Sequence, residues 1–207
     1  MLRAKGLISF EGIEGSGKST QVKLLADYLR TKGHSVLETA EPGATKIGKK
    51  IRALLLDPQN HIDPLAELLL YYADRAQHVR EVIYPALLRN TVVITDRFTD
   101  STVAYQGHAR GLDLSIIAAL NEIVVPDMKP FLTLLLDLDV EKGLKRNRDA
   151  QKADRFEQET MDFHNRVRQG FHQIAGEEPE RVKMIDASQT EGDVTADIIR
   201  IVEELWR

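Results

Sequence analysis

The sequence predicts an α/β fold in which a five-stranded parallel sheet is covered by helices on both faces. Five short runs of apolar and β-branched residues alternate with longer segments of helical periodicity. This alternation is typical of parallel strands joined by helical crossovers. A chain of 207 residues is long enough for one well-buried domain and short for two. We therefore expect a single domain over residues 1–207.

The expected strands and helices follow from two periods of the hydrophobic pattern. Continuous apolar runs predict strands that are buried on both faces, and apolar positions recurring every three or four residues predict helices. The strands are expected at residues 7–10, 35–39, 91–95, 131–136 and 182–185. The helices are expected at residues 18–32, 45–56, 64–89, 113–125, 140–148, 155–175 and 190–206.

Three local signals mark the ends or breaks of these helices. Pro64 suits a first helical turn, where the N–H that proline lacks has no intrahelical partner. Pro85 should kink or divide the third helix. The segment Ser-Gln-Thr-Glu at residues 188–191 has the spacing of a capping box for the last helix.

A glycine-rich segment between the first strand and the first helix matches the pattern G-x-x-x-x-G-K-[ST] completely. Glycines let backbone N–H groups converge on anionic oxygens, and the positive end of the following helix faces the same point. Lys18 can reach the β- and γ-phosphates, and the Ser19 hydroxyl can ligate Mg²⁺. Because a strand precedes the match and a helix follows it, a nucleotide phosphate site is favoured over an incidental turn. The residues assigned to it are Gly12, Ile13, Glu14, Gly15, Ser16, Gly17, Lys18 and Ser19.

An aspartate and an arginine stand together at the end of the third expected strand. Ligands bind at the carboxyl ends of strands in open α/β sheets, so Asp96 could hold Mg²⁺ opposite Ser19. Arg97 offers a planar fork for a second anionic group. The alternative for this pair is an ion pair at a strand end.

An aromatic residue and an arginine lie four residues apart in the third expected helix. Tyr71 and Arg75 therefore share one helical face. A ring and a guanidinium on one face can stack on a base and hydrogen-bond its edge. By itself, such a pair is also compatible with ordinary core and surface positions.

The composition and the hydropathy of the chain limit which binding partners and which cellular location we expect for the protein. A net charge of −4 argues against a general nucleic-acid-binding surface. The chain has no cysteine, which excludes disulfides and thiolate metal sites. The first six residues lack the apolar core of a signal peptide, and no run approaches transmembrane length. We expect a cytoplasmic protein that binds neither nucleic acid nor membrane.

With these features and several further segments, the chain resembles the thymidylate kinase family over nearly its whole length. The phosphate loop alone marks only a broad class, but the order of all the segments is specific. The further segments are residues 41–45 (Glu-Pro-Gly-Ala-Thr), 51–56, 96–98 (Asp-Arg-Phe), 101–107 (Ser-Thr-Val-Ala-Tyr-Gln-Gly) and 154–159 (Asp-Arg-Phe-Glu-Gln-Glu). The resemblance implies a P-loop nucleoside monophosphate kinase fold, ATP as donor, dTMP as acceptor, Mg²⁺ as cofactor and a homodimer.

The resemblance also implies which residues hold the sugar and phosphate of the acceptor. Glu14 would hold the 3′-hydroxyl and help to organise the metal site. Arg52 and Arg97 would grip the monophosphate. Tyr105 matches the residue that crowds the 2′ position of the sugar.

For the base, the resemblance implies a second set of residues. Tyr71 takes the place of an aromatic residue that stacks on thymine, and Arg75 would hydrogen-bond the base edge. Thr102 and Gln106 match polar positions that face the base.

The family divides by whether its phosphate-stabilising arginine lies in the phosphate loop or in a lid. Here residues 13–16 contain no arginine, whereas the charged stretch at residues 145–155 contains Arg146, Arg148 and Arg155. The chain thus resembles the bacterial type, with a lid at about residues 145–155. Which of the three arginines reaches the phosphoryl group stays open. The residues expected to act in catalysis are Lys18, Arg97, Arg148 and Arg155.

Two positions depart from the family pattern. Ala40 and Ala44 stand where the family commonly has an arginine and a glycine, so one cationic contact to the monophosphate is missing. Lys46, Lys49 and Lys50 are candidates to replace it.

Two other functions are alternatives. One is a kinase for a nucleoside or for another monophosphate such as dUMP. The other is a nucleotide-dependent switch, but the guanine-reading motif Asn-Lys-x-Asp of such proteins does not occur in the sequence.

Overall fold

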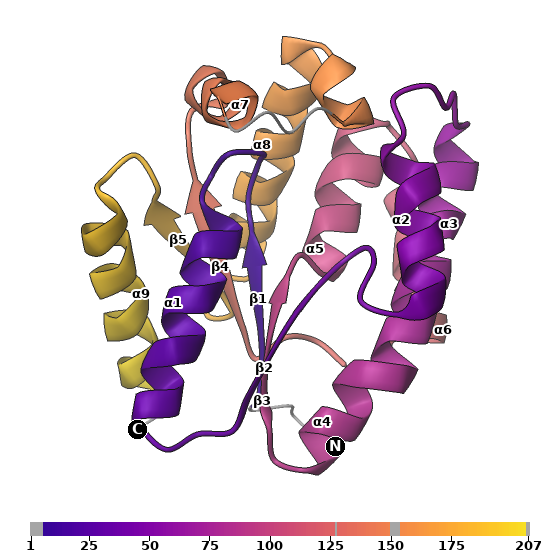
Figure 1. Ribbon diagram of the computed structural model, residues 1–207. Helices are drawn as coiled ribbons and strands as arrows, with labels where there is room; N and C mark the ends of the chain where they lie inside the picture. Colours follow the sequence, from indigo (N-terminus) through magenta and orange to yellow (C-terminus); the bar gives the residue numbers. More distant parts are fainter. Residues whose placement is uncertain (1–5, 127, 150–153, 206–207) are drawn as a thin grey trace.

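The computed structural model describes residues 6–126, 128–149 and 154–205, and these form the predicted α/β fold (Figure 1). Five strands make one sheet in the order β2-β3-β1-β4-β5, and every neighbouring pair is parallel. Each strand agrees with the expected range to within one residue at either end. The strands are β1 (Leu7–Glu11), β2 (Val36–Ala40), β3 (Val92–Asp96), β4 (Leu132–Asp137) and β5 (Val182–Asp186).

Helices cover both faces of the sheet, with α1 and α9 on one face and α4, α5 and α8 on the other (Figure 1). None of the helices in the described part of the chain is long and apolar enough to cross a membrane. The α-helices are α1 (Lys18–Thr31), α2 (Lys46–Leu56), α3 (Pro64–His78), α4 (Tyr84–Leu88), α5 (Thr99–Thr102), α6 (Leu114–Val124), α7 (Val140–Asp149), α8 (Met161–Glu177) and α9 (Glu191–Leu205). The 3-10 turn η3 (Arg155–Gln158) and two π-helical segments, η1 (Val79–Ile83) and η2 (Val103–Ala109), complete them.

The third expected helix is divided near Pro85. It consists of α3, the π-helical segment η1 and α4, and Pro85 lies in the first turn of α4. Proline has no N–H to donate, and a π-turn just before it changes the hydrogen-bond register. Pro64 also lies in a first turn, where the Asp63 carboxylate accepts a hydrogen bond from the backbone N–H of Leu65 at 2.9 Å.

One helical segment was not predicted. Residues 99–109 form α5 and η2, although the sequence analysis expected no helix there. The segment contains four β-branched residues or glycines, and most of its polar side chains are buried, so it lacks an amphipathic period of 3.6. The π-helical turn shifts the period further. This segment carries Thr102, Tyr105 and Gln106.

One predicted helix start is wrong, and the predicted cap of another helix is displaced. The segment expected as one helix from residue 155 is the short turn η3, followed by a break and then α8, whose first turn is capped by Thr160. The cap of α9 is Thr190, whose hydroxyl accepts from the N–H of Asp193 at 3.3 Å, so the capping box predicted at 188–191 lies two residues too early.

Candidate active site

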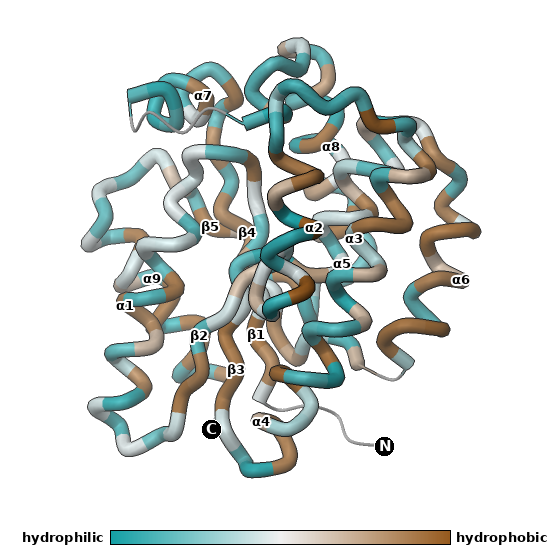
Figure 2. The backbone as a smooth tube through the Cα atoms, turned by 45° about the vertical axis from the view of Figure 1, so that its right-hand side comes forward, coloured by the Kyte–Doolittle hydropathy of each residue, from teal (hydrophilic) through white to brown (hydrophobic). Residues whose placement is uncertain are grey.

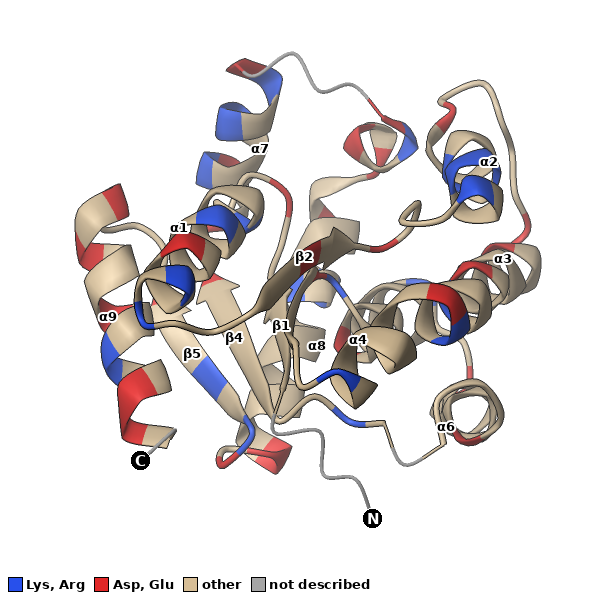
Figure 3. Ribbon diagram, turned by 60° about the horizontal axis from the view of Figure 1, so that its bottom comes forward, with Lys and Arg blue, Asp and Glu red and all other residues tan. Residues whose placement is uncertain are grey.

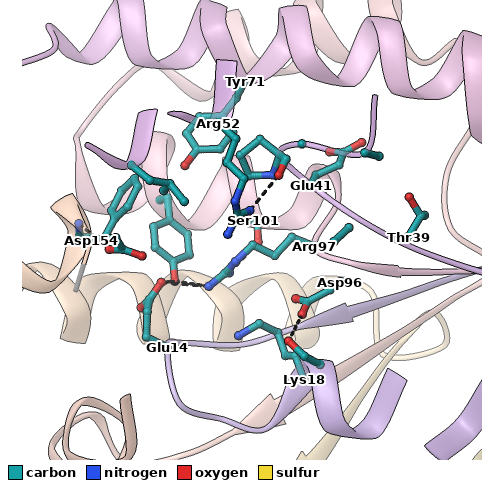
Figure 4. A pocket seen from close by; sticks show the side chains of 18 of the residues that line it. Glu14, Lys18, Thr39, Glu41, Arg52, Tyr71, Asp96, Arg97, Ser101 and Asp154 are labelled. Carbon is teal, nitrogen blue, oxygen red and sulfur yellow. Dashed lines mark hydrogen bonds and ion pairs between the residues drawn. The ribbon is translucent and has the colours of Figure 1, made fainter. Parts of the chain in front are cut away.

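The site lies at the carboxyl ends of the strands, where a cavity of about 780 Å³ opens (Figure 4). It brings together the phosphate loop, the loop between β2 and α2, one face of α3, the segment α5–η2 and the end of α7. Most of the residues to which the sequence analysis gave a role line it. These are Glu14, Gly15, Gly17, Lys18, Ser19, Arg52, Tyr71, Arg75, Asp96, Arg97, Thr102, Tyr105 and Gln106.

The phosphate loop joins the buried strand β1 to α1, and its lysine folds back into the loop. The Nζ of Lys18 donates to the carbonyl oxygens of Gly12, at 3.0 Å, and Ile13, at 2.7 Å. Burial and the nearby charge of Arg97 lower the pKa of Lys18 to about 8. The ammonium therefore occupies the concave side of the loop, where the phosphate oxygens of a nucleotide would accept its protons.

The two residues expected at a metal site are in direct contact. The Ser19 hydroxyl, at the start of α1, donates to Oδ2 of Asp96, at the end of β3, over 2.7 Å. A hydroxyl and a carboxylate oxygen are hard donors of the kind that Mg²⁺ binds, usually together with phosphate oxygens and water. The residues present therefore fit a magnesium ion that is shared with a nucleotide.

Arg97 is held in a strained backbone conformation by its side-chain contacts. Its φ is +72°, in the left-handed region that non-glycine residues rarely adopt. One terminal nitrogen donates to Ser101, at 3.0 Å, and to the carbonyl of Gly12, at 3.1 Å, and the other donates to Glu14, at 2.9 Å, and Tyr105, at 3.0 Å. The guanidinium also lies 4.8 Å from the Tyr105 ring centroid. These contacts point Arg97 into the cavity.

Glu14 is the centre of a small buried polar cluster. Its Oε1 accepts from Arg97 and from the Tyr105 hydroxyl, the latter at 2.6 Å, and its Oε2 lies 3.6 Å from Nδ1 of His164. Burial alone would raise the pKa of Glu14, but His164, Arg97, Lys18 and Tyr105 together hold it well below its usual range. Glu14 is therefore an ionised acceptor in the middle of the cavity.

Tyr71 and Arg75 both line the cavity, as their spacing on one helical face predicted. Arg75 is buried and already well bonded, to Oε2 of Glu41 at 2.8 Å, to the Thr102 hydroxyl at 2.9 Å and to the carbonyl of Phe98 at 3.0 Å. Because each of these bonds uses a different nitrogen, the two terminal nitrogens keep further protons to donate. The guanidinium is thus fixed as a donor at the cavity wall.

The loop between β2 and α2 positions Arg52. A terminal nitrogen of Arg52 donates to the carbonyl oxygen of Pro42, in this loop, at 2.8 Å. Gly43 has a φ of +118°, and a Cβ there would come within 2.8 Å of the Arg52 side chain, so glycine permits this close approach. The lysines proposed to replace the missing arginine at Ala40 lie on α2 but do not line the cavity.

The arginines of the predicted lid lie in different surroundings. Arg146 lines the cavity and donates to the carbonyl of Ala187, whereas Arg148 is exposed on α7. Basic residues gather on α7 and on α2 (Figure 3). Arg155 is buried and donates to the carbonyl of Leu55, at 2.9 Å, and to Glu67, at 2.5 Å. Residues 150–153 of the predicted lid lie outside the described residues.

The sequence analysis missed four contributors to the site. Glu41 binds Arg75, Ser101 binds Arg97, and His164 lies beside Glu14. Gly143 of α7 packs on the phosphate loop so closely that a Cβ on Gly15 would lie 2.1 Å from its carbonyl oxygen. Glu41 and Ser101 lie in segments that were singled out by resemblance. The contacts of His164 and Gly143 depend on the packing of α8 and α7, for which the sequence has no local signal.

A parallel sheet with a phosphate loop after β1 and a second anion-binding wall at its carboxyl edge defines a P-loop kinase of the nucleoside monophosphate type. The thymidylate kinase family profile matches residues 10–198. The chain belongs to the thymidylate kinase family.

Individual relatives agree with this assignment. The chain is 53% identical to thymidylate kinase of Syntrophotalea carbinolica over 194 residues, which cover 90% of each chain. It is 50% identical to thymidylate kinase of Geotalea uraniireducens, over 95% of this chain and 98% of that one. The crystal structure of thymidylate kinase from Ehrlichia chaffeensis is similar with a TM-score of 0.77 at 36% identity, and covers 95% of this chain and 97% of that one. The family and the fold expected from the sequence are thus confirmed, and the protein is a phosphotransferase.

Proposed function

We propose that this protein transfers the γ-phosphoryl group of ATP to dTMP, giving ADP and dTDP. The observation that supports this most directly is that one cavity is lined both by the phosphate loop and by the residues expected to bind the acceptor. The latter are Arg52, Tyr71, Arg75, Arg97, Thr102, Tyr105 and Gln106. Lys18 and Arg97 both donate to the carbonyl oxygen of Gly12, so the groups that would bind the donor and the acceptor phosphate lie close together in that cavity.

On the donor side, the loop and Lys18 bind the polyphosphate. Backbone N–H groups of the loop and the ammonium of Lys18 would contact the β- and γ-phosphates. Ser19 and Asp96 would hold Mg²⁺, which when bound neutralises charge on the phosphate oxygens. Because the ammonium is already inside the loop, it needs only to exchange carbonyl partners for phosphate oxygens.

On the acceptor side, no general base is required because the attacking oxygen belongs to a phosphate anion. Arg97 and Arg52 would align this oxygen with the γ-phosphoryl group, and positioning of this kind supplies much of the rate in phosphoryl transfer. Glu14 would accept from the 3′-hydroxyl of the sugar, and Tyr105 would stand at the 2′ position. Tyr71 would stack on thymine, with Arg75, Thr102 and Gln106 at its polar edge.

For the charge that develops on the transferred group, we assign the lid arginines to different tasks. Arg148 is exposed on α7, and we assign it to the charge on the transferred group. Arg146 already lines the cavity. Arg155, in contrast, is buried against Glu67 and would anchor the segment that follows the lid. The single-domain organisation with a lid at about 145–155 stays part of this proposal.

A direct assay tests the acceptor. ADP release with ATP and Mg²⁺ is measured against a panel of nucleoside monophosphates. dTMP should be the preferred acceptor. dUMP should be a poor but measurable one, because one methyl group in a pocket is worth about 10–200-fold in specificity. Faster turnover of dUMP, or of a nucleoside, would identify the alternative kinase.

We also propose that two copies of the chain associate through α6 and α3. Figure 2 shows α6 as a largely hydrophobic helix at the edge of the molecule, and only Ile117 of it is fully buried. The exposed apolar side chains of the two helices are Leu65, Leu69, Leu114, Ile116 and Ile123. A second copy would cover this face, as the family resemblance implies. Sedimentation should show a dimer, and Ile123→Glu should give a monomer. The cytoplasmic location stays a prediction.

A further inference from the structure

Glu67 lies behind the cavity and is completely buried. Its Oε1 accepts from Nε2 of Gln106 at 2.7 Å. Its Oε2 accepts from Arg155 at 2.5 Å, and Arg110 donates to both oxygens at 3.2–3.3 Å. Two guanidinium groups thus hold this carboxylate in place with charge-assisted hydrogen bonds.

Gln106 connects this buried cluster to the cavity. Its side chain is almost fully buried, and yet it lines the cavity beside Thr102 and Tyr105. A glutamine amide has two different ends, an NH₂ group that donates and an oxygen that accepts. Because a carboxylate only accepts, the NH₂ end must face Glu67. The amide oxygen is therefore the end that is left for a ligand.

We propose that Glu67 is a positioning residue that locks the amide of Gln106 and so makes the site select a base that donates from N3. This inference rests on the proposed function, with the base edge placed against Gln106. Thymine and uracil both carry a proton on N3, which the amide oxygen can accept. Cytosine carries a lone pair at N3, which would oppose that oxygen.

The lock matters because glutamine could otherwise suit either base. With its amide reversed, the NH₂ group would face the base and would donate to the lone pair at N3 of cytosine. Reversal in this protein would place the amide oxygen of Gln106 against the carboxylate of Glu67, leaving two buried acceptors without a proton between them. Glu67 thus disfavours binding of cytosine without contacting it, because it excludes the orientation of Gln106 that cytosine requires.

The variant Glu67→Gln tests the lock, with kcat/KM measured for dTMP, dUMP and dCMP. The oxygen of the new amide should stay toward Arg155, which turns its NH₂ group toward Gln106. Two NH₂ groups cannot hydrogen-bond to each other, so the reversed amide of Gln106, whose oxygen accepts from the new NH₂ group, becomes the favoured form. We expect the preference for dTMP over dCMP to fall by about tenfold or more. The preference for dTMP over dUMP should be unchanged, because these two bases present the same N3 proton. Arg75 still donates at the base edge, so dTMP should remain the best acceptor.

The control is Glu159→Gln. Glu159 pairs with the same Arg110, at 2.7 Å, but does not touch Gln106. This variant removes the same charge from the same arginine cluster and should leave both preferences unchanged. If Glu67→Gln does not fold, the double variant with Arg155→Gln leaves Arg110 paired with Glu159 and should give the same loss of discrimination.

Three results separate the inference from the function on which it rests. A folded variant at Glu67 with unchanged discrimination against dCMP overturns the lock. A variant that loses discrimination against dUMP and dCMP alike also overturns it, because general loosening of the pocket would have that effect. Failure of the wild-type protein to prefer dTMP over dCMP would instead overturn the proposed function.

Discussion

The guanidinium of Arg97 and the carboxylate of Glu14 form an ion pair at the carboxyl edge of the sheet, with 2.9 Å between a terminal nitrogen of Arg97 and Oε1 of Glu14. Glu14 belongs to the loop after β1, and Arg97 follows β3, two strands that are neighbours in the sheet although 83 residues separate the side chains in the chain. The pair joins the donor side of the site to the acceptor side. It also places the guanidinium of Arg97, which is not part of the phosphate loop, beside that loop.

The first prediction concerns the planar guanidinium group of Arg97. Arg97→Lys keeps the charge but loses the planar fork that contacts Glu14, Tyr105 and Ser101 together. Losing two charge-assisted hydrogen bonds should lower kcat/KM for dTMP by about 10²-fold or more. Steady-state kinetics with dTMP varied would measure it. The matched control is Arg168→Lys, since Arg168 makes a similar two-bonded pair with Asp137 outside the cavity. Equal effects of the two changes would contradict the role of Arg97.

The second prediction separates function from stability at Lys18. Its pKa is lowered to about 8 because burial disfavours the ammonium, so below that pH the folded state carries a cost for keeping the charge. Lys18→Met should therefore abolish transfer, yet unfold at a temperature no lower than that of the wild-type protein at about pH 7. Calorimetric unfolding and the ADP-release assay measure the two effects. A clear loss of stability would show that Lys18 supports the fold.

The third prediction is a pH dependence of stability from Asp74, which lies on α3 beside the β2–α2 loop. Burial, together with the charge of Glu41, raises the pKa of Asp74 to about 6, and its Oδ2 has no hydrogen-bond partner. A raised folded pKa means that the protonated form is favoured in the folded protein, so this contribution is present at low pH and is lost as the pH rises through about 6.

The variant Asp74→Asn removes this titration. Relative to the wild-type protein, its free energy of unfolding should rise by about 2 kcal/mol between about pH 4 and about pH 7.5. Urea unfolding at a series of pH values measures the difference. Parallel pH profiles for the two proteins would mean that Asp74 does not titrate in this range.

The fourth prediction distinguishes the lid arginines. Arg155→Gln removes one of the two guanidinium partners of the buried Glu67 carboxylate and should lower the free energy of unfolding by about 2 kcal/mol or more. Arg148→Ala, at an exposed position, should change stability by less than about 0.5 kcal/mol. It should lower kcat about tenfold or more and spare KM for dTMP, as expected for a contact made in the transition state. A normal kcat for Arg148→Ala would remove it from the mechanism.

Much of the site could be predicted because it lies in short segments with a strong local signal. The phosphate loop needs glycines, a lysine and a hydroxyl at fixed spacing, and Asp96 and Arg97 follow a strand whose run of apolar residues is unmistakable. Tyr71 and Arg75 share a helical face by spacing alone. The segment at residues 99–109 could not be predicted as helical, since its side chains are polar and buried instead of amphipathic.

The sequence by itself determined the order of the strands and of most helices along the chain, the phosphate loop and the family, because each depends on residues that are close together in the chain. Only the tertiary structure decided which distant groups share a partner. It set His164 beside Glu14, Gly143 against Gly15, and Arg155 with Gln106 on the single carboxylate of Glu67. These contacts arise where helices pack on the edge of the sheet. Side-chain chemistry permits many such pairings, and only packing selects among them.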